Sequence, residues 1–464
     1  MSDFDFDVFL VGAGQTNVPL APKLCGDGHR VGLAEKEHFG GSCVNFGCMP
    51  SKAVHASARV AHLARHGRDW GIEVGEVRPV LKDALTRARV WTEKARHHIR
   101  KSFETSGVQL YQGHARLAGR HGDGFVVTVG EERVTARRVV LDPGSRTALP
   151  DVEGLAEANP ITSETWLDRS DVGRRLVMLG GGYIGVEMAQ FYQRMGHEVT
   201  LVQHSDRILR HEDDDMAGLI VEALEGEGVR FLMGQKTTKV EPDDNGWRVH
   251  FDGGDPVSCD TIFAATGRHP NTRDLGLDTI GVETGERGAI ETDDVGRVAG
   301  VDNLYVCGDA RGGPAFTHTA HDDHHILLGH LRHERDPGGS ADRTQRLVPW
   351  AVFTDPELGR VGKAEKDAPG ATIITVPMKA NDRARVTGEG VGQVKLVLNP
   401  DDPNGKLLGA CIVGPQAGEL IHAFIMLMHL GKPLASILDA VFVHPTLFEV
   451  VHQAVDKWHK QRSS

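Results

Sequence analysis

Two similar strand–turn–helix units constrain the fold of this 464-residue chain more than any other feature. One begins with the apolar run Phe6 to Val11 and the other with Arg175 to Leu179, and a glycine-rich turn follows each run. Each unit continues through a helical stretch into a second apolar run that ends in a polar residue, 21 residues after the second glycine. A buried strand, a tight turn and a helix N-terminus form the dinucleotide-binding fingerprint. The repetition predicts an α/β fold with two Rossmann-like domains.

The first fingerprint has two glycines, Gly12 and Gly14, that let a pyrophosphate approach the backbone. Glu35 ends the following strand, where a carboxylate accepts hydrogen bonds from a ribose. Asn17 stands where close helix–strand packing prefers a third glycine. The first unit therefore predicts a dinucleotide site with one departure from the usual pattern.

The second fingerprint is complete. Its three glycines are Gly180, Gly182 and Gly185. Gln203 replaces the Glu or Asp that NAD sites usually carry, and a neutral side chain does not repel a 2′-phosphate. His204, Arg207 and Arg210 follow it, either as phosphate ligands or as exposed loop charges. The pattern favours NADPH over NADH.

Two cysteines, Cys43 and Cys48, lie five residues apart shortly after the first fingerprint. In a straight helix that offset separates Cα atoms by roughly 8–9 Å, whereas a disulfide needs about 4.4–6.8 Å. If the pair can oxidise, the segment must be the bent start of a helix, which Gly47 and Pro50 would suit. A thiolate there, near Lys52, is nucleophilic at neutral pH. The alternative is two unpaired buried cysteines.

Composition excludes several classes of function. The net charge of −12 disfavours binding to nucleic acid or anionic membranes. Apolar runs stay shorter than the ~18–20 residues of a membrane span, and Met1 to Asp7 has no signal-peptide pattern. Only one pair among six cysteines forms a motif, as expected in a reducing compartment. We therefore expect a cytoplasmic protein with neither nucleic-acid nor membrane partners.

The segment Gly40 to Lys52 resembles the redox-active segment of class I flavin-dependent pyridine nucleotide–disulfide oxidoreductases. The family pattern is Gly-Gly-Thr/Ser-Cys, four residues, then Cys-x-Pro-Ser/Thr/Lys-Lys, and Gly41 and Ser42 fall within it. The resemblance covers essentially the whole chain and looks closest to mercuric-reductase-like members. It implies FAD on the first fingerprint, a nicotinamide coenzyme on the second and a C-terminal α+β dimerisation domain.

The resemblance also implies a division of the chain. Residues 1–149 and 267–340 would form the FAD-binding domain, 150–266 the NAD(P)-binding domain and 341–464 the dimerisation domain. Gly267, Asp309 and Ala320 lie in segments where the family chain returns to FAD, and Asp309 suits the ribityl hydroxyls. Asp142 and Pro143 depart from the family's Ala-Thr-Gly. A polar linker is expected from about Glu334 to Arg346.

The resemblance also implies roles for individual residues of this chain. Tyr183 would gate the nicotinamide pocket, and Lys52 and Glu187 would form an ion pair beside the flavin. Electrons would pass from NADPH through FAD to a Cys43–Cys48 disulfide, in which Cys48 is the charge-transfer thiolate and Cys43 the interchange thiol.

The proton would come from the other subunit. The family's terminal His-Pro pair matches His444, which would take and return the proton while Glu449 orients the imidazole. The implied partners are a second copy of the chain and a small disulfide or a thiol-reactive oxidant.

Three alternatives remain. Dihydrolipoamide dehydrogenase usually has a Glu where this chain has Gln203, and mercuric reductase carries a C-terminal cysteine pair that the tail from Val451 to Ser464 does not contain. The third is a redox-silent flavin- or metal-binding protein. His321 and His325, one helical turn apart, could share a metal or form a polar helix face, and no metal is assigned to them.

Overall fold

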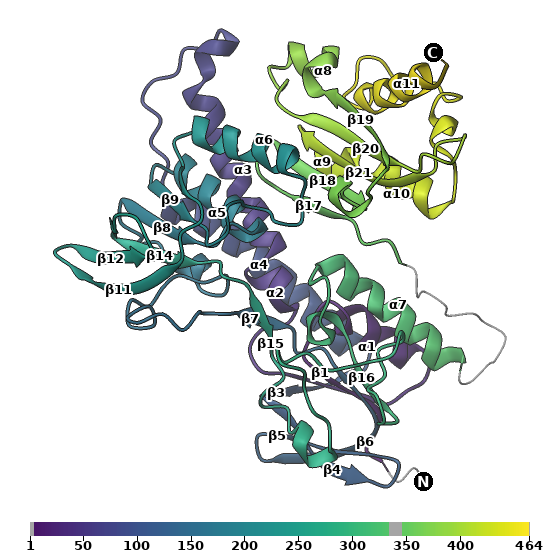
Figure 1. The fold of residues 1–464 in the computed structure, drawn as a ribbon. Helices are drawn as coiled ribbons and strands as arrows, with labels where there is room; N and C mark the ends of the chain where they lie inside the picture. Colours follow the sequence, from purple (N-terminus) through teal and green to yellow (C-terminus); the bar gives the residue numbers. More distant parts are fainter. Residues whose placement is uncertain (1–3, 334–345, 464) are drawn as a thin grey trace.

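The computed structural model describes residues 4–333 and 346–463. The chain forms three groups of elements: a lower group around the N-terminus, a second at the left and a C-terminal group at the upper right (Figure 1). The predicted linker from about Glu334 to Arg346 lies outside the described residues except for its last residue.

The first fingerprint opens a seven-stranded sheet in the described chain. Its strands are β1 (Phe6–Val11), β2 (Val31–Glu35), β3 (Gln109–Gln112), β4 (Ala115–His121), β5 (Gly124–Val129), β6 (Glu132–Leu141) and β16 (Leu304–Val306). The order is β3-β2-β1-β6-β5-β4, and β16 also pairs with β6. β1 pairs in parallel with β2 and β6 and is almost fully buried, as expected for an apolar run inside a parallel sheet.

Helices cover this sheet and lead into the cysteine segment. They are α1 (Asn17–Gly26), α2 (Gly41–Asn45), α3 (Cys48–Arg65), α4 (Leu81–Thr105) and α7 (Thr317–His333). α1 packs on α7, and α3 packs on α4 (Figure 1). α3 and α4 are separated by η1 (Gly67–Trp70), after which Gly71 adopts a left-handed φ of 74° that ends the helical turn.

The second fingerprint opens a four-stranded parallel sheet with order β10-β9-β8-β14. Its strands are β8 (Arg175–Leu179), β9 (Glu198–Val202), β10 (Arg230–Leu232) and β14 (Thr261–Ala264). The helices are α5 (Tyr183–Arg194) and α6 (Asp214–Gly226), and an antiparallel sheet contains β11 (Thr237–Asp243), β12 (Gly246–Phe251) and β13 (Val257–Cys259). The strand expected from Arg175 to Leu179 is confirmed as β8.

A short antiparallel ribbon joins the first two groups. β7 (Ser145–Thr147), which leaves the first sheet, pairs with β15 (Arg268–Pro270), which returns to it. The ribbon therefore brings Ser145 and Arg268, far apart in sequence, to the same place.

The C-terminal group has a five-stranded antiparallel sheet with order β17-β18-β21-β20-β19. Its strands are β17 (Trp350–Val352), β18 (Glu357–Gly362), β19 (Thr372–Pro377), β20 (Gln393–Leu398) and β21 (Leu407–Gly414). Its helices are α8 (Asp382–Val386), α9 (Ala417–Leu420), α10 (His422–His429) and α11 (Glu449–Ser463). The chain divides between α9 and α10 at Ile421, which packs against Gly359 of β18.

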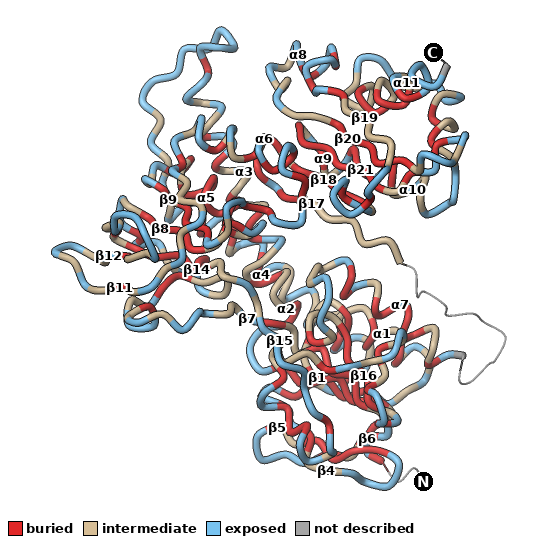
Figure 2. Tube along the Cα trace, viewed as in Figure 1, coloured by how far each residue is buried: buried red, intermediate tan, exposed pale blue. Residues whose placement is uncertain are grey.

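One hydrophobic core connects parts of all three groups. It runs from Val54 of α3 and Leu85 of α4 through the second sheet to Leu358 of β18 and Val413 of β21. Figure 2 shows the buried strands and the helix faces that cover them in red. Because α3 packs into this shared core, its N-terminus is fixed where the groups meet. Within the described residues, no helix is both long and apolar enough to span a membrane.

Candidate functional site

The two cysteines lie on either side of a break between two helices. Cys43 is in α2, and Cys48 is the first residue of α3. A Cβ on Gly47, in the bend, would lie 2.9 Å from the carbonyl oxygen of Ser42, so the bend requires glycine. The predicted bent helix start is confirmed. Both cysteines are free thiols in the described chain.

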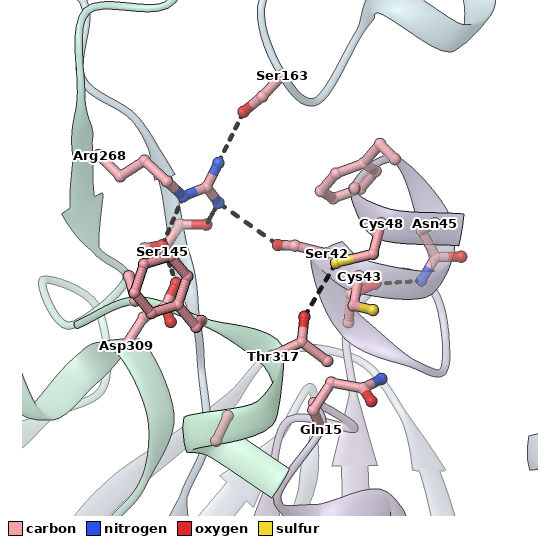
Figure 3. A pocket seen from close by; sticks show the side chains of 18 of the residues that line it. Gln15, Ser42, Cys43, Asn45, Cys48, Ser145, Ser163, Arg268, Asp309 and Thr317 are labelled. Carbon is pink, nitrogen blue, oxygen red and sulfur yellow. Dashed lines mark hydrogen bonds between the residues drawn. The ribbon is translucent and has the colours of Figure 1, made fainter. Parts of the chain in front are cut away.

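The environment of the two thiols makes them chemically different. Cys48 is exposed to the cavity, and its Sγ lies 3.1 Å from the hydroxyl of Thr317 (Figure 3). Hydrogen bonds from Cys43 and Thr317, with the charge of Lys52, hold the pKa of Cys48 below its usual range, although burial opposes this. The contact with Cys48, together with burial, raises the pKa of Cys43. Cys48 is therefore the thiol that ionises first.

Buried polar groups hold the bend in place. The indole of Trp166, itself buried, donates a hydrogen bond to the carbonyl of Phe46 at 2.8 Å. The amide of Asn45 donates to the carbonyls of Phe39 and Gly41 at 3.1 and 2.8 Å. Trp166 belongs to no motif and was not predicted, and neither was the contact of Thr317 with Cys48, because both residues are distant from the cysteines in sequence.

The predicted ion pair between Lys52 and Glu187 is present. The ammonium Nζ lies 2.9 Å from Glu187 Oε2 and 3.9 Å from the ring centre of Phe353. The other carboxylate oxygen accepts the Phe353 amide at 2.9 Å. Burial opposes ionisation of Glu187, but Lys52, His55 and the Phe353 amide lower its pKa. The pair fixes one positive charge beside the thiols.

A cavity of about 870 Å³ connects these groups with the first fingerprint. That volume lies within the range of cofactor sites. The predicted site residues that line it are Gly12, Gly14, Glu35, Gly41, Ser42, Cys43, Cys48, Lys52, Tyr183, Glu187, Asp309 and Ala320. The predicted residues outside its lining, as far as the described chain shows, are Gly180, Gly182, Gly185, Gln203, His204, Arg210, Gly267, His444 and Glu449.

The first fingerprint fits a dinucleotide. A Cβ on Gly12 would lie 2.3 Å from the carbonyl oxygen of Asp142, so the turn has no room for side chains. Glu35 is fixed at the end of β2, because its carboxylate accepts the amides of Ala13 and Glu37, each at 2.8 Å. Asn17 is tolerated at the third glycine position because its side chain folds back and donates to the carbonyl of Gly12 at 2.8 Å.

Asp142, which departs from the family's Ala-Thr-Gly pattern, caps the N-terminus of α1. Its Oδ2 accepts hydrogen bonds from the amides of Thr16 and Asn17 at 3.1 and 3.2 Å. Burial raises its pKa well above the usual range, and the charges of Asp309 and Asp323 act in the same direction. Asp142 therefore satisfies two backbone amides at this helix end.

The second fingerprint also fits a dinucleotide. A Cβ on Gly185 would lie 1.9 Å from the carbonyl oxygen of Gly180, so glycine is needed for packing there. A Cβ on Gly182 would meet no described atom within 4 Å, so packing does not require glycine at that position. An open position at the start of α5 is where a pyrophosphate approaches the backbone.

Beside Gln203, charged side chains are available at the surface. His204 and Arg210 are exposed, and Arg210 makes no ion pair with an acidic side chain among the residues that the structure describes. Arg207 instead pairs with Asp214 at 2.5 Å. The geometry leaves Arg210 available to an anionic ligand.

A polar network crosses the ribbon of β7 and β15. Arg268 donates to Ser145 and Ser163 at 2.8 and 2.7 Å and reaches Ser42 at 3.5 Å (Figure 3). Ser145 in turn donates to Asp309. Gly267, just before Arg268, adopts a φ of 108°, which only glycine adopts readily. The network ties the cysteine segment to the ribbon.

Aromatic rings line the side of the cavity near α5. Tyr183, at the start of α5, lies with its ring centre 6.0 Å from that of Phe316. Phe316 is stacked with Trp350 at 6.3 Å and with His318 at 5.2 Å. Tyr183 thus lies both at the start of α5 and on the lining of the cavity.

His444 and Glu449 lie in the C-terminal group. Nδ1 of His444 is 2.9 Å from Glu449 Oε1, and the imidazole side chain is 70% exposed. Glu449 raises the pKa of His444 through this hydrogen bond. The structure therefore presents an oriented imidazole at the surface of the chain.

Comparisons with known proteins agree with this architecture. Residues 6–323 match the family model described as pyridine nucleotide-disulphide oxidoreductase, and residues 348–455 match its dimerisation domain. The chain belongs to the pyridine nucleotide-disulphide oxidoreductase family. The predicted family and fold class are confirmed.

Family relatives cover nearly the whole chain. Dihydrolipoyl dehydrogenase of Halobacterium salinarum is 32% identical, over 97% of this chain and 95% of that protein. Mercuric reductase of Bacillus cereus is 29% identical, over 99% of this chain and 73% of that protein. The solved HOCl-induced flavoprotein disulfide reductase RclA from Escherichia coli is 27% identical, with a TM-score of 0.85 over 97% of this chain and 99% of that chain. The chain therefore has the fold of the FAD-dependent oxidoreductases of this family, followed by a dimerisation domain.

Proposed function

We propose that the protein is an NAD(P)H:disulfide oxidoreductase that reduces a small disulfide or a thiol-reactive oxidant through Cys43 and Cys48. One observation carries this proposal: Cys48, at the N-terminus of α3, shares a single cavity with Lys52 and the first fingerprint. FAD, when bound, supplies electron transfer between the nicotinamide and the cysteine pair. In this proposal residues 1–149 and 267–340 hold FAD, 150–266 hold the coenzyme and 341–464 form the dimer.

The different pKa values of the two thiols support their different roles. The lowered pKa of Cys48 suits a thiolate that faces the flavin, and the raised pKa of Cys43 suits a thiol that a base must deprotonate. The Cys43 thiolate attacks one sulfur of a substrate disulfide, so that a mixed disulfide forms and one thiol leaves. The Cys48 thiolate then attacks Cys43, releases the second thiol and restores the intramolecular disulfide.

The proton would be moved by His444 of the partner subunit. Neither His444 nor Glu449 is among the described residues that line the cavity in their own chain, and the matched dimerisation domain supports a homodimer. Glu449 holds the imidazole through Nδ1, which leaves Nε2 to accept and return the proton of Cys43. An isologous dimer would supply one such imidazole to each site.

The coenzyme we propose is NADPH rather than NADH. Gln203 presents an uncharged amide where an acid would repel a 2′-phosphate, and Arg210 and His204 lie exposed beside it. The proposed location is the cytoplasm, because the chain carries one cysteine motif among six cysteines, the pattern of a reducing compartment.

Anaerobic titration of the holoprotein, followed by a panel of acceptors, tests the proposal. We expect NADPH to bleach the flavin and a small disulfide or thiol-reactive oxidant to restore its absorbance. The panel contains glutathione disulfide, lipoamide, hypothiocyanous acid, Hg(II) and quinones. A flavin that neither NADPH nor NADH reduces would show that the protein is redox-silent.

A second candidate is dihydrolipoamide dehydrogenase. The observation that favours it is the 32% identity to the Halobacterium salinarum enzyme over almost the full chain. Preferred turnover of NAD⁺ with dihydrolipoamide would support this candidate. Mercuric reductase is a third candidate, which the 29% identity to the Bacillus cereus enzyme favours. Hg(II)-dependent oxidation of NADPH would support this third candidate.

A further inference from the structure

Three histidines form a cluster on α7, away from the cysteines. They are His321, His324 and His325, and one ring nitrogen of each lies within 4.8 Å of those of the other two. Their ring centres are 3.8 to 5.8 Å apart. The offsets of three and four residues place all three on one helix face. The spacing of His321 and His325 already predicts that these two lie together, and the fold adds His324.

His324 is held as a metal-ligating imidazole usually is. Its Nδ1 is hydrogen-bonded to the backbone carbonyl of His321. Its Nε2 lies 2.8 Å from Nζ of Lys23, which comes from the neighbouring helix α1. An ammonium can only donate, so Nε2 is the acceptor and Nδ1 carries the proton. A backbone carbonyl that fixes the tautomer is the standard support for a histidine ligand.

His324 is fully buried, so packing as well as its two hydrogen bonds fixes the position of its ring. His321 and His325 are exposed, so an ion can reach their rings from solvent.

Lys23 already places a positive charge against the cluster. Its Nζ stands at hydrogen-bond distance from the nitrogen that a metal would bind, so an incoming ion must displace it. A lysine next to an acidic cluster elsewhere in the chain is held differently. The side chain of Lys395 is only 3% exposed, and its ammonium forms ion pairs with Asp215 and Glu365 at 2.5 and 2.7 Å. Lys23 contacts one histidine and comes from a half-buried position at the end of α1.

We propose that His321, His324 and His325 bind one divalent first-row transition-metal ion per protomer, in exchange for Lys23. Three imidazoles favour ions such as Zn²⁺ over Mg²⁺ or Ca²⁺, which prefer oxygen ligands. Bond lengths of ~2.0–2.1 Å require the three nitrogens to move somewhat closer together than in the structure. The site lies apart from the cysteine cavity, since none of its three histidines is among the described residues that line it.

Titration of the oxidised holoprotein with Zn²⁺, followed by calorimetry, tests this proposal. We expect one ion per protomer in the unmodified protein. His321→Ala/His325→Ala, which changes exposed side chains only, should weaken binding at least about tenfold, the effect reported for losing even an outer-shell partner. Lys23→Met should strengthen binding about tenfold, because it removes a positive charge close to the ion.

A matched control and a structural readout complete the experiment. His97→Ala/His98→Ala removes two exposed histidines of α4 and should leave Zn²⁺ affinity unchanged. Anomalous diffraction should place the ion between the three imidazoles. Equal affinity of the unmodified protein and the His321→Ala/His325→Ala variant would overturn the proposal, as would an ion located at the cysteines or no binding below millimolar Zn²⁺.

Discussion

The side chain of Gln203 accepts a hydrogen bond from the backbone amide of Gly181 at 2.9 Å. In the first fingerprint Glu35 accepts the amide of Ala13 at 2.8 Å, so the two units repeat the same contact with different chemistry. The remaining group of Gln203 is an amide nitrogen, which donates to Ser205 Oγ at 2.5 Å. At this position the first fingerprint therefore carries a carboxylate, which can only accept hydrogen bonds, whereas the second carries an amide group that can also donate one.

This difference predicts the coenzyme preference. Gln203→Glu should lower kcat/KM with NADPH at least about tenfold and favour NADH, because a carboxylate repels the 2′-phosphate. Arg210→Ala should also weaken NADPH use. Arg207→Ala is the matched control, since Arg207 already pairs with Asp214 and should have the smaller effect. Equal use of both coenzymes by all variants would refute the assignment.

Thr317 is predicted to tune the Cys48 thiolate. A lowered pKa means that the thiolate persists at neutral pH and is lost as the pH falls through that pKa. Thr317→Val removes one hydrogen bond to the charged form, so protonation should occur about one pH unit higher. The long-wavelength absorbance of the thiolate beside the flavin, measured against pH in the two-electron-reduced protein, reports this shift. Thr317→Ser should restore the original midpoint, and an unchanged midpoint in Thr317→Val would contradict the role.

Asp142 is predicted to weaken the fold at alkaline pH. Its folded-state pKa is raised, so the stability from its neutral form is complete at low pH and decreases as the pH rises above the unfolded value. Asp142→Asn keeps an acceptor for the amides of Thr16 and Asn17 but cannot ionise. Urea unfolding of the holoprotein should show the variant gaining stability relative to the unmodified protein as the pH rises from the ordinary carboxyl pKa of 3.8, by on the order of 1 kcal/mol. A constant difference across that range would exclude ionisation of Asp142 as the cause.

Glu449 is predicted to determine the pH at which kcat/KM for the disulfide substrate falls on the acidic side. It raises the pKa of His444, and only the neutral imidazole can take a proton from Cys43. Glu449→Gln should therefore move the acidic limb of kcat/KM for the disulfide substrate to lower pH, and it should reduce the maximal rate because the ring is held less firmly. Flavin reduction by NADPH should keep its original rate, which separates this effect from a general loss of structure.

Local sequence patterns predicted the two fingerprints, the break at the cysteines and the Lys52–Glu187 pair. They succeeded because apolar runs and glycine turns act locally and because the family motifs fix residue types. Trp166 and the contact of Thr317 with Cys48 escaped prediction because both residues reach the redox segment only through the tertiary fold.

The most direct test of the electron path uses Cys43→Ser under anaerobic conditions. NADPH should reduce the flavin of this variant at close to the normal rate, whereas turnover of any disulfide substrate should be lost, because the sulfur that attacks the substrate is gone. If Cys43→Ser instead lost flavin reduction, or still turned over a disulfide, electrons would not pass from the nicotinamide through Cys48 to Cys43.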